Sequence, residues 1–113
     1  MESYREILYG RNGIQIVAEE DGRVAGSITV TTLKGNAHIG YIYIKSAYRG
    51  HELDSPLLDK AEQWAIGNKL RNIGGTLIPV PGSERHVVNL LDSKGYKVDK
   101  KGNFSKKLDL EIE

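Results

Sequence analysis

The stretch YRGHELDSPLL, residues 48 to 58, stands between the two strongest structural patterns of the chain. Before it, His38 to Lys45 (HIGYIYIK) alternates as a β-strand does, and after it comes the longest helical pattern. A short loop from a strand into a helix leaves backbone N–H groups at the helix N-terminus, where they favour negative charge. Here the loop also carries two carboxylates of its own, Glu52 and Asp54. The central question is therefore whether this loop binds an external anion.

The composition is that of one ordinary globular domain. The chain has 113 residues, of which 39% are hydrophobic and 27% charged, and its net charge is +1. This balance gives no support to nucleic acid or a membrane as a partner. The chain has no cysteine, which excludes disulfides, thiolate metal sites and a cysteine nucleophile. We expect a single domain over residues 1–113, a cytoplasmic location, and neither a signal peptide nor a membrane-spanning segment.

The first third of the chain predicts a helix and an antiparallel meander. Tyr4, Ile7 and Leu8 have helical spacing, so a short N-terminal helix is expected. Two β-rich runs then flank an Asp-Gly turn, which predicts a hairpin. With the strand that precedes the opening stretch, they form three strands, expected over residues 14–18, 23–32 and 38–45.

The remainder of the chain predicts two helices that alternate with strands. The first helix should begin at Pro56 with Asp54 or Ser55 as its N-cap, have Lys69 and Arg71 in its last turn, and stop at Gly74 or Gly75. A short strand, a second helix and a closing hairpin should follow, over residues 76–80, 83–94, 96–101 and 104–110. The predicted fold is α/β (α+β), with a mixed, mostly antiparallel sheet of about six strands in the order β-β-β-α-β-α-β-β.

The order of elements and three sequence segments together resemble the GCN5-related N-acetyltransferases. The segment IKSAYRGHELDSPLL is similar to that family's Arg/Gln-x-x-Gly-x-Gly/Ala loop, AEQWAIGNKLRNIGG to its long helix, and SERHVVNLLDSKGYKV to its Asn-x-x-Ala…Leu-Tyr-Glu-Lys-x-Gly-Phe segment. The resemblance covers residues 14 to 110. It implies a single GNAT-like domain with acetyl-CoA or CoA as cofactor and no metal. The chain departs from the family at its N-terminus, where little room precedes Ile14 for the family's first strand and two helices.

The chain departs from the family pattern at the positions that the chemistry uses. The two family glycines of the loop fall on Glu52 and Asp54, which bring bulk and negative charge toward the pyrophosphate of the cofactor. The family's tyrosine, the proposed proton donor to the CoA thiolate, falls on Leu91, and its asparagine beside the pantetheine arm falls on Glu84.

The resemblance also names candidate site residues. His38 falls where many members carry a glutamate that acts as general base through water, and an imidazole can take a proton near neutral pH. Tyr41 and Tyr43 are further candidates for an acid or a pocket wall. If acetyl-CoA binds, its contacts are expected from Ile42, Ile44, Arg49, Gly50, His51, Leu53 and Ser55.

Each candidate also has a purely structural interpretation. A lone histidine on a strand is more often a half-exposed sheet residue, and tyrosine is favoured in strands for packing alone. Asp54 at a helix start could supply the negative charge that the helix dipole favours, in place of a bound phosphate. His51 and His86 have no metal-site spacing, and the basic run from Lys97 to Lys107 is interleaved with acids.

Two functions remain open at this point. The first is a protein of the acetyltransferase type with a degraded acetyl-CoA loop, weak or absent N-acetyltransferase activity, and a binding or regulatory role. The second is an active acetyl-CoA-dependent N-acetyltransferase that acts on a primary amine. A small amine or a protein partner is expected, and a homodimer would cover the sheet face that the short N-terminus leaves open. Nucleic acid is not expected as a partner.

Overall fold

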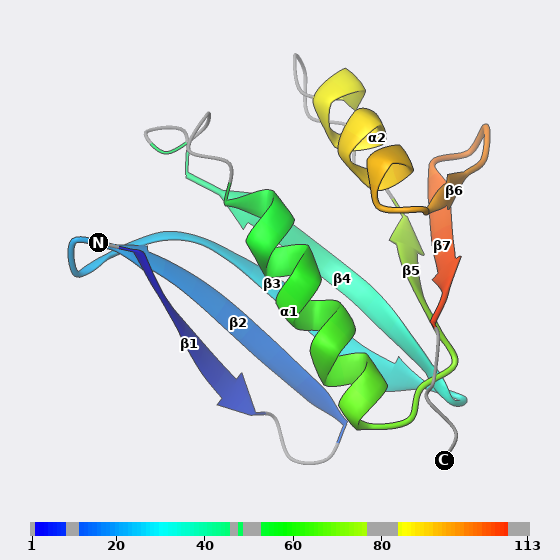
Figure 1. The fold of residues 1–113 in the computed structure, drawn as a ribbon, viewed down its shortest axis with the longest axis horizontal. Helices are drawn as coiled ribbons and strands as arrows, with labels where there is room; N and C mark the ends of the chain where they lie inside the picture. The colour runs from blue at the N-terminus through cyan, green and yellow to red at the C-terminus, as the bar shows by residue number, and fades with distance from the viewer. Residues whose placement is uncertain (1, 9–11, 46–47, 49–52, 77–83, 109–113) are drawn as a thin grey trace.

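The computed structural model describes residues 2–8, 12–45, 48, 53–76 and 84–108. Within these residues a seven-stranded sheet has the order β1-β2-β3-β4-β5-β7-β6, and every neighbouring pair is antiparallel except β4 and β5 (Figure 1). The elements are β1 (Glu2–Leu8), β2 (Gly13–Glu20), β3 (Arg23–Leu33), β4 (Asn36–Ile44), α1 (Asp54–Gly67), β5 (Asn72–Thr76), α2 (Glu84–Ser93), β6 (Lys97–Val98) and β7 (Asn103–Lys107). The mixed, mostly antiparallel α+β fold is confirmed, with one strand more than expected.

The extra strand replaces the predicted N-terminal helix, and that prediction is wrong. Residues Glu2–Leu8 form β1, which pairs antiparallel with β2 so that Tyr4 lies opposite Ala18. A segment of seven residues is too short to hold a helix by itself. Pairing with β2 satisfies the backbone groups on one side of this edge strand, and the side chain of Tyr4 packs against the core.

Both β-turns of the meander have the chemistry that tight hairpins require. Asp21 and Gly22 have positive φ angles of 53° and 78°, and Lys34 and Gly35 have 51° and 81°. Positive φ at both central residues is the type I′ geometry, which matches the right-handed twist of the strands. The predicted hairpin and the three-strand meander are confirmed.

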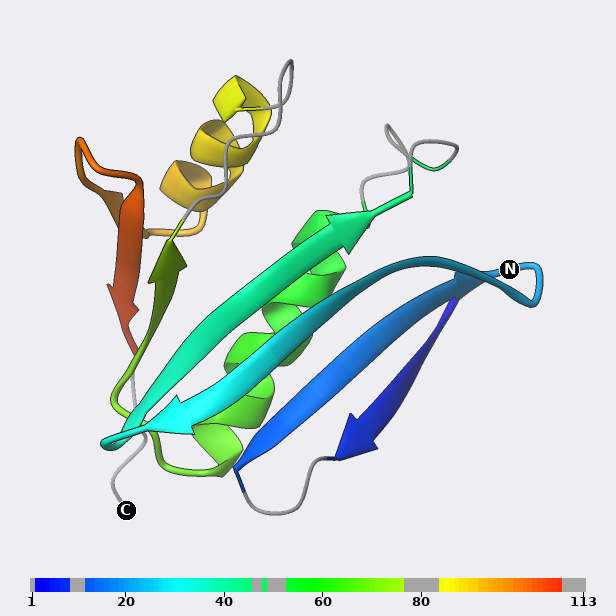
Figure 2. The same cartoon turned by 180° about the vertical axis from the view of Figure 1, so that it is seen from behind.

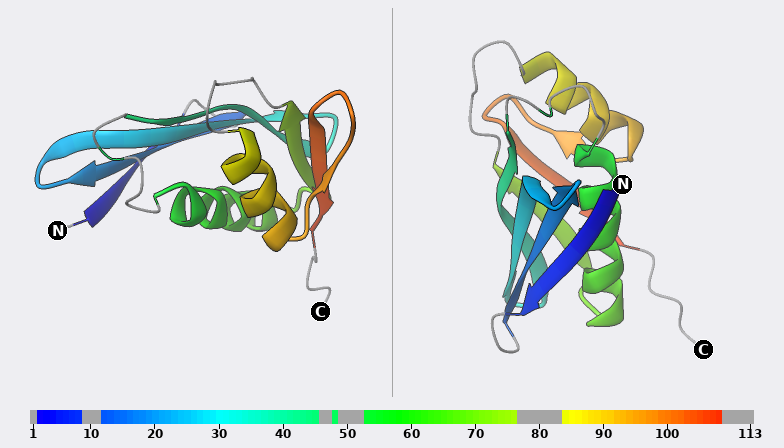
Figure 3. Two further views of the ribbon diagram at one scale, coloured as in Figure 1. Left: turned by 90° about the horizontal axis from the view of Figure 1, so that it is seen from above. Right: turned by 90° about the vertical axis from the view of Figure 1, so that its left-hand side faces the viewer.

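The core lies between the sheet and α1. Figure 3 shows both helices on the same side of the sheet, and Figure 2 shows the opposite face, where no described helix lies. Alternate residues of β2 and β3 point toward α1, and the register pairs Ile14 with Val30 and Ile16 with Ile28. On the facing side of α1, four side chains are fully buried: those of Leu57, Leu58, Ala61 and Ala65.

Helix α1 begins two residues before the predicted start. Its N-cap is Leu53, whose backbone is already helical and whose side chain is 2% exposed, so burial of a leucine in the core sets the helix entry. Asp54 and Ser55 therefore lie in the first turn, and the prediction that either of them is the N-cap is wrong. Asp54 still supplies a negative charge beside the positive end of the helix dipole.

Helix α1 ends at Gly67, well before Gly74, so the predicted last turn and stop are also wrong. Lys69 adopts a left-handed φ of 59°, its N–H donates to the carbonyl of Ile66, and the N–H of Leu70 donates to the carbonyl of Ala65. These two bonds make a Schellman motif. The buried side chain of Leu70 then anchors the chain after the turn.

Strand β5 is formed by Asn72–Thr76, most of which precedes the strand that was predicted over residues 76–80. The predicted strand over residues 76–80 lies outside the described residues except at Thr76. Helix α2 and the closing hairpin of β6 and β7 confirm their predictions to within a few residues. Phe104 of β7 lies opposite Gly75 of β5, and Val98 of β6 lies opposite Phe104.

Candidate functional site

The sheet opens into a V between its two parallel strands. β4 and β5 pair only from Ala37–Ile39 with Ile73–Gly75, at the end where both strands begin. β4 then continues to Ile44, whereas β5 ends at Thr76. The two strands diverge toward their carboxyl ends in both face views (Figures 1 and 2). Within the described residues, no strand pairs with this edge of β4 beyond Ile39.

A β-bulge lies at the point where the strands part. Thr29 pairs with Tyr41 and Val30 pairs with Ile39, so Gly40 is an extra residue with no partner in the β3 register. A β-carbon built on Gly40 meets no atom within 4 Å. The bulge therefore presents backbone, with open space beside it, at the apex of the V. Bulges commonly redirect backbone groups next to functional sites.

The N-terminus of α1 lies at the same end of the molecule as the open end of the V (Figure 1). The side chain of the N-cap residue, Leu53, accepts no hydrogen bond from the first turn. The third helical residue, Pro56, has no N–H to donate. Asp54 adds a carboxylate to this turn. The preceding candidates Arg49, Gly50 and His51, together with Glu52, lie outside the described residues.

The candidate catalytic residues lie on the sheet face opposite the helices. His38 lies opposite Thr31, and Tyr43 lies opposite Ser27, so the bulge keeps both side chains on one face. Both are exposed, and they are separated by roughly 15 Å along the strand. The side chain of Tyr41 lies outside the described residues. The structure therefore places His38 and Tyr43 on one surface but does not bring them together.

His38 also lines a shallow hollow of about 320 Å³ where β4 and β5 are paired. Asn36 and Asn72 share this hollow, and the side-chain amide of Asn72 donates to that of Asn36 over 2.9 Å. The hollow lies at the closed end of the V, away from the start of α1. The hydrogen bond between Asn72 and Asn36 ties the start of β5 to the start of β4 beside His38.

The described candidates for cofactor contact belong largely to the core. Ile42 and Ile44 are half-buried and pack against the core cluster on the α1 side, and Leu53 is fully buried. Ser55 is half-buried in the first turn of α1. Any contact that Leu53 makes with a ligand must come from its backbone.

Leu91, at the position of the expected proton donor, is fully buried in the core cluster. Its hydrocarbon side chain has no proton to donate, and no part of it reaches the surface. The side chain of Glu84 lies outside the described residues.

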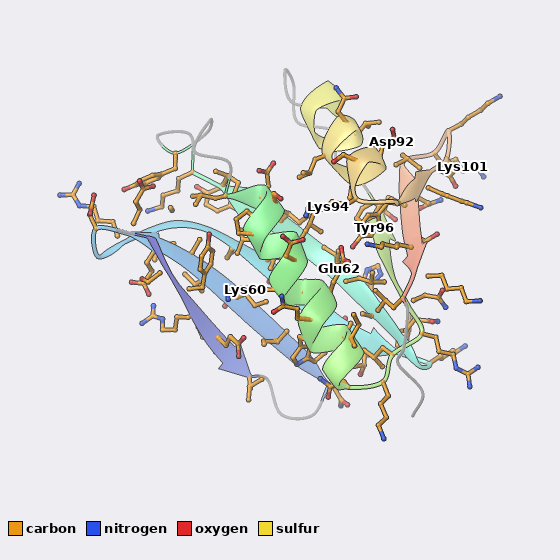
Figure 4. The ribbon with its side chains drawn as sticks, viewed as in Figure 1. Lys60, Glu62, Asp92, Lys94, Tyr96 and Lys101 are labelled. Atoms are coloured by element: carbon orange, nitrogen blue, oxygen red, sulfur yellow. The ribbon has the colours of Figure 1, made fainter. Side chains whose placement is uncertain are left out.

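Sequence reasoning missed one polar cluster entirely. Glu62 of α1 accepts hydrogen bonds from the hydroxyl of Tyr96 over 3.0 Å and from the ammonium group of Lys106 over 2.8 Å. Burial, together with the negative charge of Glu62, raises the pKa of Tyr96 well above its ordinary value. One turn earlier in α1, Asp59 pairs with Lys94. Figure 4 labels Glu62, Lys94 and Tyr96 of this cluster. The partners are more than thirty residues apart, so no local spacing could have indicated them.

Two classes of site receive no support from the described residues. They contain no group of three or more His, Asp or Glu side chains that could hold a metal ion. Nor do they contain a helix long and apolar enough to cross a membrane.

Comparison with known proteins identifies the family to which the chain belongs. Residues 1–78 match the model of the acetyltransferase (GNAT) family, which is more than half of the chain. No curated protein matches the sequence.

Solved structures resemble the whole chain. A GNAT-family acetyltransferase from Streptococcus pneumoniae has a TM-score of 0.73 and 21% identity, over 89% of this chain and 70% of that one. The ribosomal-protein-S18-alanine N-acetyltransferase of Escherichia coli has a TM-score of 0.80 and 11% identity, over 100% and 97%. A streptothricin acetyltransferase assigned in Bacillus anthracis, solved with acetyl coenzyme A, has a TM-score of 0.74 and 15% identity, over 90% and 67%. At these identities the likeness concerns the fold, and the family model decides membership: the chain belongs to the GNAT family of acetyltransferases.

Proposed function

We propose that this chain is a GNAT-family domain with weak or absent N-acetyltransferase activity, whose V between β4 and β5 serves a binding or regulatory role. The observation that carries the proposal is the fully buried Leu91. In acetyl transfer the amine attacks the thioester carbonyl, the C–S bond breaks, and the departing thiolate takes up a proton while the amine loses one. A hydrocarbon side chain at the donor position leaves the thiolate without that proton source.

The described residues fit a CoA-type cofactor only in part. The edge of β4 beyond Ile39 and the bulge at Gly40 are backbone features, and they are suited to hold an extended amide-bearing chain and to polarise a carbonyl. Asp54 in the first turn of α1 opposes a pyrophosphate there. Two like unit charges 4 Å apart repel by about 1 kcal/mol even in water, and by more where they are partly shielded from it.

A thermal-shift titration with acetyl-CoA and with CoA tests the proposal. A ligand that binds the native state raises the unfolding midpoint by mass action. We expect little or no rise up to millimolar ligand, and no release of CoA thiol when acetyl-CoA is incubated with simple primary amines. A clear rise at micromolar acetyl-CoA together with steady thiol release would overturn the proposal.

A variant with glycines at the acidic positions sharpens the test. Glu52→Gly combined with Asp54→Gly removes the opposing charge and should strengthen CoA binding by about tenfold, the equivalent of 1.4 kcal/mol. The same variant should be less stable, because α1 loses a favourable charge at its N-terminus. Asp92→Gly is the control, since it removes an exposed carboxylate from α2 and should leave CoA affinity unchanged.

The alternative is an active acetyl-CoA-dependent N-acetyltransferase that acts on a primary amine. The observation in its favour is the V itself, because its backbone groups do not depend on the side chains at positions 52, 54 and 91. His38 or Tyr43 on the open face would then exchange protons with the amine. In that case thiol release should be measurable, and His38→Gln should lower it.

The proposal includes a homodimer, a cytoplasmic location and a single domain over residues 1–113. Ile7 and Leu8 at the end of edge strand β1 are 37% and 65% exposed, which supports an apolar contact there. Light scattering that reports a monomer at high concentration would contradict the dimer. Cell fractionation tests the location, and limited proteolysis tests the single domain.

A further inference from the structure

The second half of the fold is attached to the first by few backbone links. We call β5, α2, β6 and β7 together the C-terminal unit. Its strand pairing to the rest is confined to Ala37–Ile39 with Ile73–Gly75. One more described bond, from the N–H of Arg71 to the carbonyl of Gly35, lies close by at the β3–β4 turn. All of these links lie at the closed end of the V. By themselves they would let the C-terminal unit rotate relative to β4, as about a hinge.

A second attachment lies away from that hinge, on α1. Glu62 bonds Tyr96, in the connection between α2 and β6, and Lys106 of β7. The side chain of Glu62 is 14% exposed and that of Lys106 is 28% exposed, so water screens this interaction little. Tyr96 is itself buried, and its ring meets that of Phe104 edge-on at a centroid distance of 5.8 Å. Glu62 therefore binds the C-terminal unit at two different elements.

Asp59 and Lys94 extend this attachment by one helical turn toward the open end of the V. Asp59 precedes Glu62 by three residues and so lies on the same side of α1. Lys94 directly follows α2, and its ammonium group pairs with the carboxylate of Asp59. Figure 4 shows Glu62, Lys94 and Tyr96 gathered between α1 and the C-terminal unit.

We propose that Asp59, Glu62, Lys94, Tyr96 and Lys106 form a clamp that sets the opening between β4 and β5. Two arms joined at one end keep a fixed angle only if further contacts, away from the hinge, hold them. Buried side chains of the C-terminal unit, among them Leu91 and Phe104, share the core with α1, and the clamp adds directional polar contacts to that packing. Because α1 is packed rigidly on β2, β3 and β4 through buried side chains, the clamp ties the C-terminal unit to the same body that carries the β4 edge. The five residues act as positioning residues for the V, and their relevance to ligand entry rests on the proposed function.

The opening can be measured directly because the chain has no cysteine of its own. Spin labels on Lys45→Cys, at the end of β4, and Asn89→Cys, on α2, report the distance across the V, since both positions are exposed. Labels on Lys45→Cys and Gln63→Cys report a reference distance between β4 and α1. In Glu62→Ala we expect the distribution between positions 45 and 89 to broaden or to shift to longer distances, while the reference distribution stays unchanged.

Graded variants separate the clamp from a general loss of stability. Tyr96→Phe removes one hydroxyl and should give a smaller change of the same kind. Glu62→Gln keeps one oxygen that can accept from Lys106 and gains an NH2 that can donate to the hydroxyl of Tyr96, so it should restore part of the wild-type distribution. Glu19→Ala is the matched control, because it breaks the Arg5–Glu19 pair between β1 and β2, far from the C-terminal unit. It should change neither distance.

The proposal is overturned if folded Glu62→Ala keeps the wild-type distribution between positions 45 and 89. If Glu62→Ala does not fold, Tyr96→Phe and Lys106→Met decide the question by the same measurement, and wild-type distributions in both overturn it. No ligand is needed, so this result is independent of the cofactor titration. A clear thermal shift with acetyl-CoA and steady thiol release, found together with an altered distance in Glu62→Ala, would overturn the proposed function and leave the clamp.

Discussion

Lys69 ends α1 in a backbone conformation that a lysine adopts at a cost. Its φ is 59°, in the left-handed region where a β-carbon crowds the following carbonyl. At this position of a Schellman motif most helices carry glycine. Lys69→Gly should therefore raise the free energy of unfolding by about 1 kcal/mol, measured by chemical denaturation.

A glycine at a helical φ provides the control for Lys69→Gly. Gln63 lies in the interior of α1 and is exposed, so Gln63→Gly should lower stability by roughly 0.5 to 1 kcal/mol. If the two substitutions lower stability equally, the strain argument at Lys69 is wrong.

Asp99 organises the turn between β6 and β7. One of its carboxylate oxygens accepts hydrogen bonds from the backbone N–H groups of Asn103 over 2.9 Å and Lys101 over 2.8 Å. These bonds, that from Asn103 first, lower the pKa of Asp99 below its ordinary value of 3.8. A pKa lowered by folding contributes stability above the unfolded pKa and loses it as the pH falls through the folded value.

Asp99→Ala should therefore speed amide exchange at Lys101 and Asn103 at neutral pH. The difference from wild type should shrink as the pH falls from about 3.8 through the lower pKa of the folded-state carboxylate, which then takes up a proton and gives up these bonds. Hydrogen exchange followed by NMR at several pH values measures this. A difference that is constant down to pH 2 would show that the hydrogen bonds of the charged form are not responsible.

At the level of elements, the sequence predicted strand and helix types better than their ends. The Asp-Gly turn is a local signal, and the structure confirms the hairpin that it predicted and the three-strand meander. β1 was missed because the helical spacing of Tyr4, Ile7 and Leu8 is also compatible with an edge strand, and pairing with β2 decided between them. Such pairing is a tertiary effect that overrides local preference.

The boundary between α1 and β5 was missed for a related reason. Gly74 and Gly75 were interpreted as a helix stop, whereas they lie inside β5, where neighbouring backbone comes very close. A β-carbon on Gly74 would lie 2.4 Å from the carbonyl oxygen of Phe104. The requirement for glycine comes from strands that are distant in sequence, so the local pattern could not reveal it.

The space around each glycine predicts different changes in stability when Gly75 and Gly40 of the V are replaced by alanine. Gly75→Ala places a methyl group 2.5 Å from the carbonyl oxygen of Ile39, so β5 must move away from β4, and stability should fall by about 1 to 3 kcal/mol. Gly40→Ala meets no atom within 4 Å and should change stability by less than about 0.5 kcal/mol. Thermal unfolding of both variants tests this, and an equal loss of stability would contradict the assigned geometry.

At the level of the whole molecule, the resemblance of three segments predicted the family and the fold class but not the contacts between the elements. The segment that follows β4 leads into α1, as expected. The sequence could not show that Leu91 is wholly buried, because burial depends on how α2 packs. The bonds of Glu62 to Tyr96 and Lys106 join residues 34 and 44 positions apart, so they follow from the fold and from no spacing in the chain.

The same division into two parts predicts how the native protein opens. β2 and β3 are paired along their whole length and packed beneath α1, whereas the C-terminal unit is joined to β4 over only three residue pairs. Units with fewer attachments open with smaller free energies than the global value. Amides of α2, β6 and β7 should therefore exchange at least about tenfold faster than those of β2 and β3, a gap of about 1.4 kcal/mol. Hydrogen exchange under native conditions with low denaturant measures both sets in one sample.

Glu62→Ala should widen the difference in exchange rate, because it should speed exchange only in the C-terminal unit. Glu19→Ala should leave the difference unchanged. Equal exchange free energies throughout wild type would mean that the molecule opens as one cooperative body.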